Sequence, residues 1–279
     1  MSVKNFIPEV WAAQIERELS PKRVFVEDCN REFEGDLKDF GDTVHILGAG
    51  SPTVYDITPE SLRQKIKDPE FLEDSSVDLK VQHGCYYNYQ IPDIDLAMAK
   101  PDSLKSVFQE ETTEKIANKH DKYIAGFAVN KSAVPLFETP EIVTVDNVLD
   151  IIDRAVEKLF ENNVSDSTPI SLTISPKFFT LFKKAYLKGD TNNHELMKNG
   201  KVAMYGGATI KRSNNVYREN GVDYAMMRTK RAIAFVDAFV RTEAYRPEGY
   251  FSDAVKGYSV YEGKLVRPKE MFTLNVKYQ

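Results

Sequence analysis

His83 and Cys85 are the closest pair of side chains in the sequence that could support nucleophilic or metal chemistry. Residues two apart on one strand face lie roughly 6 to 7 Å apart, whereas a nucleophile and its base need contact near about 3 Å. Zinc would need a third and a fourth ligand, and no nearby cluster supplies them. We therefore interpret the pair as members of an apolar strand face. Cys29 and Cys85 are the only cysteines, and both are expected to be reduced.

Four other short motifs resemble binding sites without completing one. Residues 48–52 (GAGSP) lack the third glycine of a dinucleotide fingerprint and the lysine of a phosphate-binding loop. The glycine pair at 206–207 precedes a predicted strand, so no helix N-terminus is offered to a phosphate. Asp93 and Asp95 lack the further carboxylates of a calcium loop, and the basic run 228–231 (RTKR) is typical of a solvated or salt-bridged surface. We expect no catalytic residue, no cofactor and no metal.

Composition narrows the class of protein. The 279 residues are 42% hydrophobic and 28% charged, which predicts a soluble folded chain of one large domain or two ordinary ones. No apolar stretch approaches the roughly 18 residues needed to span a bilayer, and no signal-peptide core follows Met1, so we expect a cytoplasmic chain without a membrane partner. The net charge of −5 disfavours electrostatic binding to nucleic acid or anionic lipid.

The longest regular pattern is an alternation of apolar and polar residues from 77 to 91. A single strand of this length would span roughly 50 Å, which is hard to contain in a globule of this size. Residues 42–47 and 54–57 are the expected antiparallel partner, with a polar tip at 58–76. Such a ribbon is marginal alone, so we expect it to lie on a neighbouring copy of the chain. Tyr86 points away from the apolar face and is typical of an interface residue.

Helices and further strands indicate a mixed α+β chain. A short amphipathic helix at 7–19 is expected to anchor through Trp11 to an apolar surface. A long helix of about 24 residues is expected from Asp102 or Ser103. A second helix opens near Asp146, and a buried strand at 169–174 leads to a third helix that Ser175 caps. The second helix is expected to bury Val148, Ile151, Ile152, Ala155 and Leu159. Strands at residues 208–211, 224–227 and 233–235 are expected to complete the body.

This order of elements resembles the major capsid proteins of tailed bacteriophages, whose fold is named after phage Hong Kong 97. The chain is similar in particular to the subgroup related to the Salmonella phage coat protein. The stretches that carry the resemblance are collinear over nearly the whole chain: residues 6–11 (FIPEVW), 26–35 (VEDCNREFEG), 41–46 (GDTVHI), 121–126 (DKYIAG), 213–216 (SNNV), 243–247 (EAYRP) and 251–257 (FSDAVKG). Glu262 interrupts the Tyr-Gly pair that the family often has, and we expect this departure to alter the last hairpin.

The resemblance implies an α+β, Hong Kong 97-like capsid fold in four parts. These are an N-terminal arm (1–37), a long β-hairpin extended loop (38–98), a peripheral domain with a spine helix (99–140 and 237–279) and a mixed α/β axial domain (141–236). Inter-subunit contacts are expected at seven residues: Trp11, Val77, Leu79, Val81, Tyr86, Tyr87 and Tyr89. Lys65, Lys67 and Lys80 lie in the ribbon, but none matches the family's cross-linking motif, so no catalytic residue is carried over.

The implied function is structural. Copies of the chain would form pentamers and hexamers of an icosahedral shell that encloses double-stranded DNA without sequence-specific binding. The chain would be made in the host bacterial cytoplasm and reside in the virion capsid. Because no scaffold-like segment precedes residue 7, a separate scaffolding protein is expected, together with a portal and a possible decoration protein. The alternatives are an encapsulin-type compartment and a cytoplasmic α+β enzyme.

Overall fold

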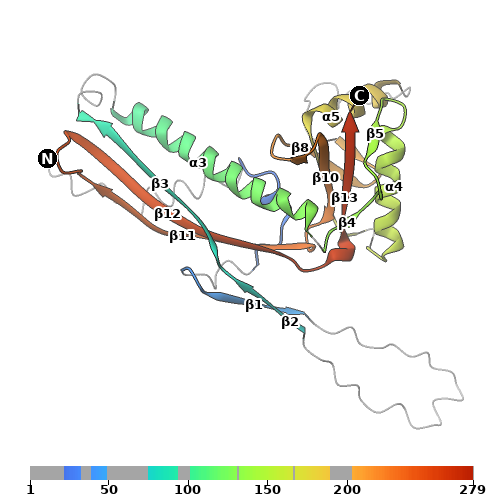
Figure 1. Ribbon diagram of the computed structural model, residues 1–279, viewed down its shortest axis with the longest axis horizontal. Helices are drawn as coiled ribbons and strands as arrows, with labels where there is room; N and C mark the ends of the chain where they lie inside the picture. Colours follow the sequence, from blue (N-terminus) through green and yellow to red (C-terminus); the bar gives the residue numbers. More distant parts are fainter. Residues whose placement is uncertain are drawn as a thin grey trace, which may run out of the picture.

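The computed structural model describes residues 22–32, 39–48, 75–93, 101–130, 132–165, 167–188 and 203–278. These residues form an elongated arrangement of two parts joined by long strands (Figure 1). In one part, helix α3 (Pro101–Ala125) lies along a three-stranded antiparallel sheet of β11 (Ile233–Tyr245), β12 (Ser252–Leu265) and β3 (His83–Pro92). In the other, helices α4 (Val148–Glu161) and α5 (Pro176–Lys188) pack on an eight-stranded sheet. The mixed α+β class is confirmed.

Helix α3 is the long helix that the sequence predicts, and it begins at Pro101. Its inward residues Ile116 and Ile124 are buried in one apolar cluster with Cys85 of β3 and Phe235 of β11. The helix therefore covers one face of the three-stranded sheet. It continues into a 3-10 turn, η6 (Gly126–Val129), whose Ala128 is buried in the same cluster.

The long alternating stretch is two strands and not one, which corrects the expected 50 Å strand. Its first part, β2 (Ser75–Lys80), pairs antiparallel with β1 (Thr43–Gly48), as the sequence predicts for 42–47. Its second part, β3, pairs antiparallel with β12, with His83 opposite Tyr261. The alternation continues across the break because each half buries its odd-numbered face, although in a different sheet. The expected partner at 54–57 and most of the expected tip lie outside the described residues.

The pair β1–β2, here called the ribbon, is rooted on its own chain. Its inward residues Val44, Ile46, Leu79 and Val81 form an apolar cluster with Ala234 and Val236 of β11 and Val260 of β12. Phe40, just before β1, fills the space beside Gly84, where an added Cβ would lie 2.4 Å from its ring. The root of the ribbon therefore packs on the sheet face that α3 leaves uncovered.

The eight-stranded sheet has the order β4-β13-β10-β6-β8-β7, with β5 beside β13 and β9 beside β10. Helix α4 buries all five residues expected to face inward, and β6 is buried throughout, so both predictions are confirmed. The Ser175 hydroxyl accepts the backbone amide of Phe178 at 3.4 Å, which confirms the predicted cap. The strands are β4 (Val134–Pro135), β5 (Glu141–Val143), β6 (Ile170–Ile174), β7 (Ala203–Tyr205), β8 (Ala208–Arg212), β9 (Tyr217–Glu219), β10 (Val222–Thr229) and β13 (Met271–Tyr278).

Three predictions about local structure are changed or refined. Strand β13 lies inside the eight-stranded sheet, although its residues were expected with the peripheral part. Glu262 lies within β12 in regular register with Val236, so it does not alter a hairpin. Arg228 of the basic run is fully buried, which is contrary to the expected surface position. Its guanidinium finds a partner inside the protein, because it donates to the Phe25 carbonyl oxygen at 2.5 Å.

Candidate inter-subunit surfaces

The pair His83 and Cys85 does not form a catalytic arrangement. Cys85 is buried, with its sulfur 3.1 Å from the Ser259 hydroxyl and 4.0 Å from Nε2 of His120. Burial raises the pKa of the Cys85 thiol, the opposite of what a thiolate nucleophile needs. The His83 side chain is 51% exposed and contacts Glu262 through Nδ1 at 2.9 Å. The interpretation as an apolar strand face is confirmed for Cys85 and wrong for His83.

The other chemical motifs also have structural partners where they are described. Asp93 forms an ion pair with Arg246, while Asp95 and residues 49–52 lie outside the described residues. Gly206 and Gly207 form the turn between β7 and β8, with φ of 56° and 80°. Within the described ranges, no three His, Cys, Asp or Glu side chains gather as a metal site. No helix in those ranges is long and apolar enough to cross a membrane.

A first candidate surface is the face of the three-stranded sheet that α3 does not cover. Tyr86 is 85% exposed there and lies opposite Tyr258. The next row pairs Asn88 with Lys256, whose ammonium lies 3.2 Å from Glu243. We call this surface the open sheet face and define it by its outward residues: Tyr86, Asn88, Gln90, Arg241, Glu243, Tyr245, Lys256 and Tyr258.

Contacts within the open sheet face hold its side chains in fixed positions. The Tyr245 hydroxyl donates to Oδ1 of Asn88 at 3.0 Å, and the Lys256 ammonium lies 5.0 Å from the centre of the Tyr245 ring. Phe40 stacks on Tyr258 with ring centres 6.3 Å apart and planes 11° apart. The root of the ribbon thus covers one end of this face, and the rest is an ordered surface of aromatic and charged groups. Such a mixture is typical of protein interfaces.

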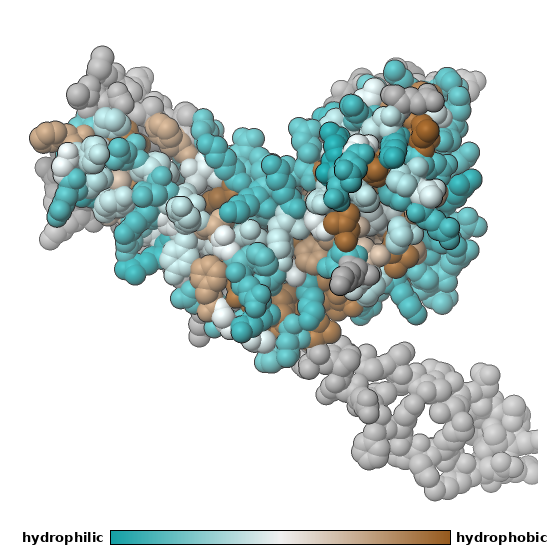
Figure 2. Space-filling model, viewed as in Figure 1, coloured by the Kyte–Doolittle hydropathy of each residue, from teal (hydrophilic) through white to brown (hydrophobic). Residues whose placement is uncertain are grey.

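A second candidate surface is the hairpin between β11 and β12, at the end of the molecule far from the eight-stranded sheet (Figure 1). Phe251 is 87% exposed and Tyr250 is 64% exposed. At this end of the molecule, a few hydrophobic residues lie exposed on a surface that is otherwise mostly hydrophilic (Figure 2). The hairpin is fixed to the end of β3, because the Asp93 amide donates to the Phe251 carbonyl oxygen at 3.0 Å. We call this surface the tip.

The structure separates the seven residues expected at inter-subunit contacts. Leu79 and Val81 are 1% exposed within their own chain, and so have no surface left for a neighbour, which corrects their assignment. Val77 packs partly on the same cluster, Tyr87 bonds Thr242 at 2.9 Å, and Tyr89 stacks on Phe108 of α3. Trp11 lies outside the described residues. Tyr86 is the described member that stays open.

The sequence reasoning did not single out Phe40, Tyr250 and Phe251. A signal for the last two existed, because two adjacent aromatic residues follow Pro247 and Gly249, residue types that favour turns. Aromatic residues in a turn have no strand neighbours to bury them. Phe40 gave no such signal, because its role depends on the distant Tyr258.

Comparison with solved structures places this fold among viral shells. A structure from Mycobacterium phage Che8 has a TM-score of 0.68 and 25% sequence identity, covering 90% of this chain and 90% of that chain. The capsid structure of the cyanophage P-SCSP1u has a TM-score of 0.64 and 15% identity, covering 92% and 88%. A virus-like particle from Pyrococcus furiosus has a TM-score of 0.56 and 11% identity, covering 95% and 98%. No protein-family model matches the sequence, and no curated protein matches it.

The chain therefore has the fold of tailed-phage major capsid proteins, as the resemblance implies. Several of these neighbours are described as phage capsids, among them those of the cyanophage P-SCSP1u, bacteriophage PhiM1 and phage XM1.

Proposed function

We propose that copies of this chain assemble as pentamers and hexamers into the icosahedral shell of a tailed double-stranded DNA phage or prophage. The observation that carries this proposal is the position of the ribbon. It packs on the sheet face opposite α3 and runs away from the tip, so that the rest of that face, toward the tip, stays open (Figure 1). The chain's own ribbon covers one end of this sheet face. A ribbon from a neighbouring copy could lie on the open sheet face and cover the rest.

The tip supplies a second kind of contact. A single exposed Phe needs no explanation, but Phe251 and Tyr250 stand together on a hairpin that the Asp93–Arg246 ion pair joins to the end of β3. In a closed symmetric assembly every copy places the same patch in an equivalent contact, so each small contact is repeated many times. Repetition makes a stable shell from interfaces that are weak one at a time.

The partners of the proposed shell follow from the implied function. The net charge of −5 favours a shell that encloses DNA without neutralising it and without reading its sequence. A separate scaffolding protein, a portal and a decoration protein complete the proposal, with production in the bacterial cytoplasm. We also propose the arm, extended-loop, peripheral and axial parts, with residues 271–278 moved to the axial part because β13 pairs with β10.

Electron microscopy and size-exclusion chromatography of the purified chain, alone and with its genomic neighbours, test the proposal. Closed shells or capsomer-sized rings are expected. Tyr86→Ser should reduce shell yield at least tenfold without unfolding the chain, because Tyr86 is almost fully exposed. Met204→Ser, at an exposed apolar position on β7, is the matched control and should assemble normally. Only monomers or dimers under both conditions would contradict the proposal.

An encapsulin-type compartment is the second candidate, favoured by the similarity to the Pyrococcus furiosus virus-like particle. The same shells would then enclose a protein in place of a genome. Nuclease-protected DNA in particles purified from the native source supports the phage shell, whereas a protected enzyme supports the compartment.

A further inference from the structure

The carboxylate of Glu262 joins three elements where the ribbon leaves the body. Its Oε2 accepts the backbone amide of Gln82 at 3.0 Å and contacts Nδ1 of His83 at 2.9 Å. Its Oε1 accepts the hydroxyl of Tyr123 on α3. Gln82 lies between β2 and β3, so the bonds connect β12 both to the end of β2, at the root of the ribbon, and to the helix. The Glu262 side chain is 10% exposed, so water does little to weaken these bonds.

The other contacts at the root of the ribbon do not fix its direction as well. The apolar cluster around Leu79 and Val260 holds the ribbon on the sheet, but apolar contact has no preferred angle. Lys264 adds one bond, from its ammonium to the Asp78 carbonyl oxygen at 2.8 Å, and this bond is exposed. Hydrogen bonds to a buried carboxylate are directional and stronger than neutral ones. Glu262 is thus the group best placed to set the angle.

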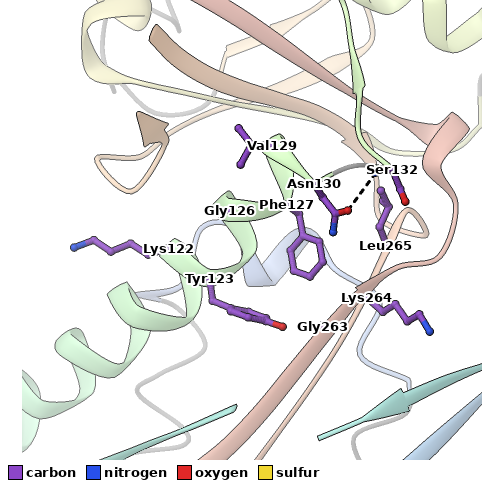
Figure 3. Close-up of a pocket in the computed structure, with 10 residues that line it drawn as sticks. All are labelled: Lys122, Tyr123, Gly126, Phe127, Val129, Asn130, Ser132, Gly263, Lys264 and Leu265. Carbon is purple, nitrogen blue, oxygen red and sulfur yellow. Dashed lines mark hydrogen bonds between the residues drawn. The ribbon is translucent and has the colours of Figure 1, made fainter. Parts of the chain in front are cut away.

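Tyr123 connects the same carboxylate to the helix. Figure 3 shows its ring pointing from α3 toward β12 at Gly263, along an open cleft of 660 Å³ that both residues line. The ring is held by Tyr261 at 5.2 Å, Phe127 at 5.5 Å and His83 at 4.8 Å between centres. Movement of the ribbon root would therefore have to disturb a packed aromatic group as well as the carboxylate.

We propose that Glu262 is the positioning residue of the ribbon, because its carboxylate sets the direction in which β1 and β2 leave the body. This inference rests on the proposed function, in which the ribbon reaches a neighbouring copy. A small change of angle at the root is repeated in every copy of a closed shell. Loosening the root should therefore broaden the distribution of shell diameters and leave assembly itself intact.

Glu262→Gln tests this proposal in the unassembled chain. Both carboxylate oxygens accept hydrogen bonds, and an amide can satisfy only one of the two sides. Hydrogen exchange at the Gln82 amide should become at least tenfold faster. Glu270→Gln is the matched control, because Glu270 also accepts two side-chain bonds, from Thr229 at 2.5 Å and Arg267 at 2.9 Å, and neither donor belongs to the ribbon. Exchange at Gln82 that is equally fast in both variants would overturn the proposal.

His83→Ala keeps the test decisive if Glu262→Gln does not fold, since His83 is half exposed. It should raise the exchange rate at Gln82 by a smaller factor, and an unchanged rate would count against Glu262. Shell diameters measured by electron microscopy give the second readout. Faster exchange with an unchanged diameter distribution would overturn the positioning role. Failure of the wild-type chain to form shells would instead contradict the proposed function, while the exchange result would still decide the role of Glu262 at the root.

Discussion

Asp121 on α3 accepts the backbone amide of Phe25 at 3.0 Å, across 96 positions of sequence. The same carboxylate accepts the amides of Val24 at 2.9 Å and Val26 at 3.2 Å. Three parallel amides satisfied by one buried side chain fix residues 24–26 to the helix. Residues 24–26 lie within the proposed arm (1–37), so this part of the arm is packed on α3 of its own chain.

Asp121→Ala should cost about 2 to 4 kcal/mol of the free energy of unfolding, because it leaves buried amides without an acceptor. Urea unfolding of the unassembled chain measures this loss. Asp150→Ala, at an exposed position in the first turn of α4, is the control and should change stability by less than about 1 kcal/mol. Equal losses in the two variants would show that the amides find other partners.

Arg228 faces the same segment from β10, and its replacement should be equally damaging. Its guanidinium donates to the Phe25 carbonyl oxygen, and Nη1 lies 3.3 Å from the Cys29 sulfur. Arg228→Met keeps much of the volume but removes a charged donor from that carbonyl, which keeps only the Asp28 amide at 3.2 Å and the Cys29 thiol at 3.4 Å. We therefore expect a loss of about 2 kcal/mol in urea unfolding. Arg231→Met removes a half-exposed cation of the same basic run and should cost below about 1 kcal/mol.

Gly257 marks a close approach of β12 to its neighbours. A Cβ there would lie 2.4 Å from the Tyr87 hydroxyl and 2.9 Å from the Arg241 carbonyl oxygen. Gly257→Ala should therefore lower the melting temperature and cost about 1 to 3 kcal/mol, since the Arg241 backbone cannot move aside easily. Gly126→Ala has nothing within 4 Å of the new Cβ and no positive φ, so it should be neutral or slightly stabilising. Equal melting temperatures would contradict the steric argument.

Local patterns predicted individual elements well, and pairings between distant elements poorly. Helix α4 and the Ser175 cap followed from spacing within a few residues, so nothing distant could overturn them. The alternation at 77–91 predicted one apolar strand face, but not that the strand is interrupted at Gln82, between two sheets. An alternation of apolar and polar residues indicates which side chains of a strand are buried, but not which other strand or helix covers them. The long strands β11 and β12 were missed over most of their length for the same reason.

The candidate surfaces illustrate the same limit. Tyr86 could be predicted, because a tyrosine on the polar side of a strand stands out. Leu79 and Val81 were assigned to a neighbour, since an isolated ribbon offers them no cover. Their cover comes from Val236 and Val260, which lie 155 to 181 positions further along the sequence. Exposure in the assembly depends on such long-range contacts, and the sequence pattern does not contain them.

His120 predicts how stability depends on pH. It is fully buried on α3, between the rings of Tyr261 at 4.4 Å and Phe235 at 5.7 Å. Burial first, and then the nearby charge of Arg23, lowers the pKa of His120 from 6.5 to about 3. The unfolded chain therefore binds this proton at a higher pH than the folded chain does. Stability is lost as pH falls below the unfolded pKa, until the folded pKa is reached.

Between pH 7 and pH 5 this histidine should contribute a loss of about 2 kcal/mol. Urea unfolding of the unassembled chain at the two pH values measures it, and His120→Gln separates it from the carboxylates that also titrate. The variant should lose about 2 kcal/mol less than the wild type over this range. His45→Gln, at an exposed histidine of the ribbon, should leave the wild-type difference in place. If His120→Gln and the wild type lose the same amount, the imidazole is not held neutral by the fold.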